Sequence, residues 1–141
     1  MSTVSIPLEN ISEGQIFQKE FHLNQTVYDH FLEAFSDNNP LHTNDAYAQS
    51  KGFSARVMHG AILNGFISHF VGMTLPLKNT VLHSVQIEFK KPNYLNDRIL
   101  LEAKVGQKVE AVKTIVLEIK INNLTRDYLS AKAKVQVGVL K

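Results

Sequence analysis

Asp37 and His42 stand five positions apart in the segment DNNPLH. A carboxylate and an imidazole that share one water molecule can move protons to and from it, which is general acid–base catalysis. Each residue also has a structural explanation, because aspartate near a helix end and histidine in a first helical turn are common. The spacing by itself leaves two interpretations open, a pair of proton-transfer groups or the break between two helices.

The residues between this pair indicate how it would be held. Pro40 suits the first position of a helix, where its missing N–H would have no partner in any case. Asn39 is then the natural N-cap, since the following proline disfavours helical backbone there. We expect the helix to run from Pro40 towards Ser50, with Asp37 in the break before it and His42 in its first turn. Both side chains could then point into the space that the break faces.

His59 and Gly60 form a second candidate site. Glycine at the start of an apolar helix lets a ligand approach the backbone closely. The free N–H groups and the dipole at a helix N-terminus favour negative charge, such as that on a polarised carbonyl oxygen. The structural alternative is that Gly60 only relieves crowding where the helix meets a sheet.

Further elements are needed to position these residues. A leading strand is expected from Gln15 to Leu23, followed by a helix that Thr26 caps and that ends near Ser36. A later helix, from His59 to Met73, is apolar on nearly every side. That pattern predicts a helix that is buried all round.

The second half of the chain alternates apolar and polar residues, which indicates an antiparallel sheet packed on one side only. Such a sheet curling around one apolar helix is the hot-dog architecture, an α+β fold, with the short helices in an overhanging segment. No linker or repeat divides the chain, so one domain is expected over residues 1–141. The alternating runs cover residues 81–89, 99–105, 115–121 and 129–139, and the inward residues of the first are Val81, Val85, Ile87 and Phe89.

Composition removes several classes of function. The chain has no cysteine, which excludes disulfides and thiolate nucleophiles. Its 6 histidines include no i,i+4 pair and no H-E-x-x-H motif, so no metal site is expected. A net charge of +2 is too small for a nucleic-acid footprint. No signal peptide is visible, and the longest apolar segment, Gly60–Leu75, is short for a membrane span, so a cytoplasmic protein is expected.

Two stretches resemble the MaoC-like family of (R)-specific enoyl-CoA hydratases and dehydratases. FSDNNPLHTNDAYAQSKGF followed by ARVMHGAILNGF is similar to the signature S-G-D-x-N-P-[LIV]-H, a later alanine or serine, and H-G opening the central helix. FKKPNYLND resembles the family's F-x-x-P-V-Y-x-G-D, with Asn96 where glycine is usual. The sequence departs from the family signature at two places. Phe35-Ser36 replaces Ser-Gly before the aspartate, and Gly65 stands where some members carry a serine.

The resemblance implies a hot-dog homodimer that acts on an acyl thioester of CoA or acyl-carrier protein and needs no cofactor. Asp37 and His42 would activate the water that adds across the 2,3-double bond or is lost from it. The Gly60 N–H would polarise the thioester carbonyl, and Asn39 would brace the loop. The implied substrate-binding set is completed by His59, Asn64 and Gly65, and by Arg56, Lys90 and Lys91 near the phosphates.

Two alternatives on the same fold stay open. A thioesterase would direct water at the carbonyl carbon instead of C3, and release of free CoA thiol would distinguish it. A non-catalytic acyl-thioester-binding subunit is suggested by the departures at Phe35-Ser36 and Gly65. The intact pair of Asp37 and His42 argues against a mere binder, which would need neither proton-transfer group.

Overall fold

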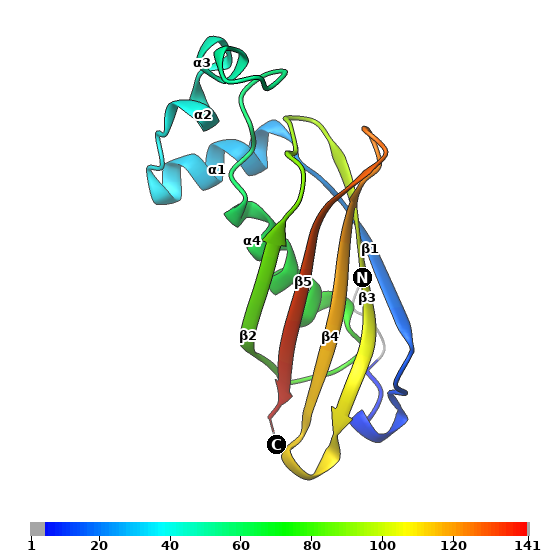
Figure 1. The fold of residues 1–141 in the computed structure, drawn as a ribbon. Coiled ribbons are helices and arrows are strands. Elements are labelled where there is room, and N and C mark those ends of the chain that lie inside the picture. Colours follow the sequence, from blue (N-terminus) through cyan, green and yellow to red (C-terminus); the bar gives the residue numbers. More distant parts are fainter. Residues whose placement is uncertain (1–4, 141) are drawn as a thin grey trace.

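The structure, a computed structural model, describes residues 5–140. Five strands form one antiparallel sheet, α4 lies across one face of it, and α1, α2 and α3 gather beyond one end (Figure 1). This arrangement confirms the expected hot-dog fold of the α+β class. In chain order the elements are η1 (Leu8–Asn10), β1 (Ile16–His22), α1 (Gln25–Phe35), α2 (Pro40–Thr43), α3 (Asp45–Ser50), α4 (Ala61–His69), η2 (Phe70–Thr74), β2 (Thr80–Phe89), β3 (Arg98–Val109), η3 (Glu110–Val112), β4 (Thr114–Asn123) and β5 (Tyr128–Val139).

The sheet has the strand order β1-β3-β4-β5-β2, and every neighbouring pair is antiparallel. β1 confirms the expected leading strand, and the later strands confirm the period-two pattern. Their apolar positions form the wall of one core that α4 closes, because alternate side chains of a strand point to the same face. The completely buried apolar positions of the three central strands are Ile99, Leu101, Ala103, Val105, Leu117, Ile121, Ala131, Val135 and Val137.

α4 is covered by the sheet on one side only. Ile62, Leu63 and Ile67 are buried, and the chain continues into the π-helical turn η2, where Phe70 and Val71 are also buried. The expectation of a helix buried all round is wrong, because the sheet within residues 5–140 wraps only one side of it. The exposed positions of α4 are Ala61, Asn64, Gly65, Ser68 and His69.

The N-cap of the first helix lies two residues earlier than expected. Asn24 is the N-cap of α1, and its side-chain oxygen accepts a hydrogen bond of 3.0 Å from the Val27 N–H. The expected cap, Thr26, lies inside the helix. Asparagine in extended backbone satisfies a first-turn donor as well as threonine does, and here it comes first along the chain.

The second helix is two short helices. α2 ends at Thr43, and Asn44 adopts an extended conformation with φ −132° and ψ 110°. The Asn44 side chain then caps α3 by accepting a hydrogen bond of 2.9 Å from the Tyr47 N–H. The expectation of one continuous helix from Pro40 to Ser50 is therefore wrong, because the side chain of Asn44 bonds to the backbone as a cap and this competes with continuation of the helix.

The inward pattern of β2 shifts near its start. The register with β5 slips between Leu82 and Ser84, which leaves His83 as the extra residue of a β-bulge. Because a bulge moves the alternation by one residue, Leu82 packs against the core and Val81 is 36% exposed. Val81 and Phe89, which is 55% exposed, were wrongly expected to be inward, whereas Val85 and Ile87 pack against the core as expected.

The overhanging helices stand next to the start of α4. Figure 1 shows the chain running from α3 back towards the sheet and directly into α4. The break between α1 and α2 and the first turn of α4 are thereby brought to the same end of the sheet. Among residues 5–140, no helix combines the length and the hydropathy that crossing a bilayer would require.

Candidate active site

Asp37 lies in a tight connection between α1 and α2. Ser36, the C-cap of α1, takes a left-handed backbone conformation with φ 53° and turns the chain out of the helix. The exposed Asp37 carboxylate then accepts a hydrogen bond of 3.3 Å from the Asn39 N–H. Asn39 caps α2 as expected, with its side-chain oxygen accepting from the Leu41 N–H at 3.0 Å. The carboxylate is thus held close to the chain while one of its oxygens stays accessible.

His42 is fixed in one tautomer. Its Nδ1 lies 2.7 Å from the carbonyl oxygen of Val57, and a carbonyl can only accept, so Nδ1 carries the proton. In the neutral ring Nε2 then keeps its lone pair and can accept a proton. The backbone of His42 is held from the other side, because the Tyr28 hydroxyl donates to the His42 carbonyl at 2.7 Å. Burial raises the pKa of Tyr28, so this donor keeps its proton at neutral pH.

His59 contacts both members of the pair. Its Nε2 donates a hydrogen bond of 2.9 Å to the backbone carbonyl of Asp37. Its ring lies on that of His42 with centroids 4.3 Å apart, and on that of Phe31 at 4.7 Å. His59 is only 3% exposed, and its Nδ1 is buried with no hydrogen-bond partner in the described part of the chain. The structure thus joins Asp37 and His42 through a third side chain, to which the sequence had assigned only substrate binding.

The N-terminus of α4 presents two free donors. The N–H groups of Ile62 and Leu63 bond back to the carbonyls of His59 and Gly60 at 3.1 and 2.9 Å. Within residues 5–140, no backbone acceptor outside the helix pairs with the N–H of Gly60 or Ala61. Such unpaired first-turn donors are the feature that binds negative charge at a helix start.

Two depressions meet at this helix start. The larger, of about 1020 Å³, lies between β1, α1 and α4 and has Asp37 on its wall. The smaller, of about 460 Å³, is lined by His42, Gly60 and Phe89. Ala61 lines both. The single common space that the sequence predicted for Asp37 and His42 is therefore two adjoining spaces, since the His59 ring packs against His42 and anchors the Asp37 backbone.

The expected binding residues divide between these depressions. Asn64 and Gly65 line the larger one, and Lys90 and Lys91 line the smaller one. Lys90 pairs with Glu88 at 2.6 Å, and this hydrogen bond lowers the pKa of the Glu88 carboxyl. The Lys91 ammonium lies 5.1 Å from the ring centroid of Tyr128.

Arg56 lines neither depression. Its guanidinium lies over the ring of Tyr28 at 4.9 Å, and its backbone N–H donates to Asp45 at 2.9 Å. The structure therefore does not bring Arg56 together with Lys90 and Lys91, because it is held against the overhanging helices instead.

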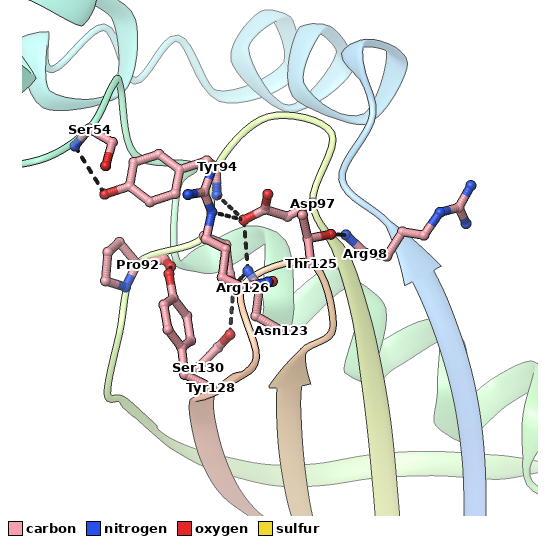
Figure 2. A network of polar contacts seen from close by, with 11 residues as sticks. Ser54, Pro92, Tyr94, Asp97, Arg98, Asn123, Thr125, Arg126, Tyr128 and Ser130 are labelled. Carbon is pink, nitrogen blue, oxygen red and sulfur yellow. Dashed lines mark hydrogen bonds and ion pairs between the residues drawn. The ribbon is translucent and has the colours of Figure 1, made fainter.

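A buried polar network that the sequence did not predict supports the smaller depression (Figure 2). The Asp97 carboxylate, 2% exposed, accepts hydrogen bonds from the Asn123 side chain at 2.7 Å and from Arg126 Nε at 2.9 Å. Asn93 accepts from Asn123 and from Ser130, at 2.9 and 2.6 Å. Its members come from two distant parts of the chain, residues 93–97 and 123–130, and of these only FKKPNYLND carried a signal for it.

Two hydrogen bonds from backbone N–H groups link the network and its loop to the segment before α4. The Asn93 carbonyl accepts from the Met58 N–H at 2.9 Å, directly before His59. The Tyr94 hydroxyl accepts from the Ser54 N–H at 3.3 Å (Figure 2). The loop between β2 and β3 therefore positions the segment that leads into His59 and Gly60.

The described residues hold no cluster of three or more histidine, aspartate or glutamate side chains that could bind a metal ion. The arrangement instead offers a carboxylate, an imidazole with a free Nε2 and two backbone donors around one helix start. The fold is that of a hot-dog domain, and the groups at this helix start are of the kinds that can transfer protons and bind a negatively charged oxygen.

Residues 9–126 match the model of the MaoC like domain, and the chain belongs to this family. An (R)-specific enoyl-CoA hydratase of Rhodospirillum rubrum is 27% identical over 129 residues, covering 92% of this chain and 90% of the relative. A second (R)-specific enoyl-CoA hydratase, from Aeromonas caviae, is 31% identical over 75 residues, which are 53% of this chain and 56% of the relative. Both are hydratases by name, in agreement with the hydro-lyase class that the sequence predicted.

Solved structures show the same fold. An R-hydratase from Pseudomonas aeruginosa in the unliganded form superposes with a TM-score of 0.88 at 20% identity, covering 100% of this chain and 90% of that chain. The (R)-hydratase from A. caviae involved in PHA biosynthesis gives a TM-score of 0.84 at 23% identity, covering 94% and 99%.

Proposed function

We propose that the protein catalyses the reversible, (R)-specific addition of water to a 2-enoyl thioester, which yields the 3-hydroxyacyl thioester. The observation that carries the proposal is the orientation of His42. Its Nδ1–H is bound to Val57, so its Nε2 is left as a proton acceptor on the depression that also holds Gly60. The family and the names of the relatives support the same reaction.

Each residue has a defined part in the reaction. Asp37 and His42 hold a water molecule where the two depressions adjoin, beside Ala61, and take its proton as the hydroxyl oxygen bonds to C3. Electrons of the 2,3-double bond move towards the thioester carbonyl, whose oxygen accepts hydrogen bonds from the N–H groups of Gly60 and Ala61. The resulting enolate-like charge is stabilised by the helix start as in an oxyanion hole. The proton taken from water is then delivered to C2, where the enolate electrons form the new C–H bond, so that water is added across the double bond without any other reactant.

The carrier of the acyl group is proposed to be CoA or acyl-carrier protein, which both present pantetheine. The smaller depression supports this, because Lys90 and Lys91 stand on its rim and can meet a phosphate. Lys90 would have to leave Glu88, an exposed pair that contributes little stability.

We also propose that two copies form the active protein in the cytoplasm. β2 is an edge strand of the sheet, with β5 on one side and no described strand on the other. Pairing of the β2 edge with a second copy would extend the sheet and give partners to the backbone N–H and C=O groups that the edge leaves unpaired. Light scattering should give a dimer mass, and a stable, fully active monomer would contradict this part.

The test of the reaction is turnover of crotonyl-CoA by Asp37→Asn, His42→Gln and the double variant. Asparagine at position 37 can still accept the hydrogen bond from the Asn39 N–H. Glutamine at the half-buried position 42 loses the ring contact with His59, at a cost of about 1 kcal/mol, so all three variants should fold. If both groups activate water, each single change should lower kcat roughly 10²–10⁴-fold. The double variant should lose little more, because both groups act on one water molecule.

Controls and readouts separate this reaction from its rivals. Asp29→Asn and His83→Gln make the same chemical changes at exposed positions that line neither depression. Loss of enoyl absorbance with an (R)-3-hydroxyacyl product supports hydration, whereas release of CoA thiol identifies a thioesterase. Near-wild-type kcat in both single dyad variants would overturn the proposed mechanism.

A further inference from the structure

We infer that the larger depression holds the acyl chain of the substrate, and that the preferred acyl groups have about eight carbons or more. This inference rests on the proposed function and adds the substrate class to it. The depression measures about 1020 Å³, which lies at the upper end of the range for small-molecule sites, about 300–1,000 Å³. A butenoyl group alone would leave most of that space to water.

The walls of this depression are largely aromatic. Phe21 and Phe66 stack at its β1 and α4 sides with ring centroids 4.4 Å apart. Phe31 and Phe35 line its α1 side with centroids 4.9 Å apart. Phe35 is 69% exposed and adds to the continuous apolar lining that Phe31 begins on this side. These four rings favour a hydrocarbon ligand.

The position of the proton-transfer groups sets the direction of the substrate. Asp37 and Ala61 stand on the wall of the larger depression, and Ala61 also lines the smaller one beside Gly60. A carbonyl bound at the first turn of α4 therefore has C3 and the chain beyond it on the Asp37 side. The sulfur and the pantetheine arm then extend into the smaller depression, towards Lys90 and Lys91.

Chain length should therefore raise catalytic efficiency. Each methylene moved from water into an apolar site is worth up to about fourfold in binding, from about 0.8 kcal/mol per buried CH₂. 2-Octenoyl-CoA carries four more methylenes than crotonyl-CoA. We expect its kcat/KM to be at least about tenfold higher, since an open depression captures only part of the full burial.

Gly65→Leu tests the assignment directly. Gly65 lines the larger depression, and a Cβ built on it meets no atom within 4 Å. Leucine is also the better helix former, so the variant should fold. Its side chain would occupy space meant for the acyl chain, and the ratio of kcat/KM for octenoyl-CoA to that for crotonyl-CoA should fall about tenfold. Phe35→Ala, on the opposite wall, should lower the same ratio about threefold.

Gly72→Leu is the matched control. Gly72 lies in η2, a Cβ there also meets nothing within 4 Å, and it lines neither depression. The ratio should stay at its wild-type value in this variant. Calorimetry with saturated decanoyl-CoA and butyryl-CoA, which cannot be hydrated, gives a second readout. Decanoyl-CoA should bind at least about tenfold tighter to the wild type, and Gly65→Leu should remove that preference.

The outcomes separate the inference from the reaction. Turnover of crotonyl-CoA with equal kcat/KM for octenoyl-CoA, or an unchanged ratio in both Gly65→Leu and Phe35→Ala, would overturn the inference and leave the proposed reaction standing. No turnover of either substrate, together with tight binding of decanoyl-CoA that Gly65→Leu removes, would overturn the reaction and support the apolar site. No turnover and no preference for decanoyl-CoA would overturn both.

Discussion

The variant Gly60→Val tests whether the thioester carbonyl binds at the start of α4. An ideal Cβ at Gly60 would lie 2.9 Å from Cε1 and Cζ of Phe89, closer than real contacts allow. The Phe89 side chain is 55% exposed, so its ring can turn into solvent and relieve the clash. The backbone at Gly60 is helical, with φ −58° and ψ −34°, which valine can adopt. We expect a cost of about 1 kcal/mol and a fall in Tm of roughly 2–4 °C.

The effect on turnover should be much larger than the effect on stability. The valine side chain would stand in front of the Gly60 and Ala61 N–H groups and keep the carbonyl oxygen away from them. Loss of one donor of this kind lowers kcat by about 10²–10³-fold. The assay is loss of enoyl absorbance, with Tm and dimer mass measured on the same sample.

Phe89→Ala and the double variant supply the control. Removing the Phe89 ring takes away the clash but leaves the valine in front of the helix start. The double variant should therefore regain the wild-type Tm while kcat stays low. Recovery of kcat in the double variant would refute the reasoning, since the loss would then come from the displaced ring and not from the blocked donors.

Two further predictions concern the scaffold of the site. Ser36→Gly should raise the free energy of unfolding by about 1 kcal/mol, because left-handed backbone with φ 53° is strained for serine; urea unfolding that shows no gain would contradict this. Tyr28→Phe should cost about 1 kcal/mol at pH 7 through the bond lost to His42. Burial raises the pKa of Tyr28, so the stability that its hydroxyl contributes is complete below about pH 10 and is lost at higher pH. The free energy of unfolding of Tyr28→Phe should therefore fall less steeply at alkaline pH than that of the wild type. An equally steep fall would refute the role given to the Tyr28 hydroxyl.

Local patterns in the sequence predicted most of the fold. The strands follow from alternation, which depends only on neighbouring residues, and the cap at Asn39 follows from the proline after it. The errors arose where a single residue changes a local pattern. Asn44 divides a helical run, and the bulge at His83 moves β2 by one position. Asparagine and histidine also occur at many positions where they neither end a helix nor form a bulge, so the residue type alone does not predict these two features.

The sequence predicted which residues gather at the site, but it did not predict how they contact one another. The order of the residues does not indicate that His59 bonds to the Asp37 carbonyl or that Tyr28 bonds to that of His42. These contacts join positions 22 and 14 residues apart. Nor does it indicate that Ala61 lines two depressions, because cavities depend on how α1, α4 and β1 pack together.

The departures from the family motif are themselves informative. Ser36 and Asn96 stand where the motif has glycine, and both adopt left-handed backbone, with φ of 53° and 71°. The conformation that glycine favours is therefore kept, at a cost in stability of about 1–2 kcal/mol at Ser36 and less at Asn96, because asparagine adopts left-handed backbone more readily. Because the turn before Asp37 keeps its shape, the substitution of Ser36 removes no group that touches substrate. The departure at Ser36 thus gives no support to a non-catalytic subunit, and the contacts of Asp37 and His42 with His59 hold both residues beside the start of α4.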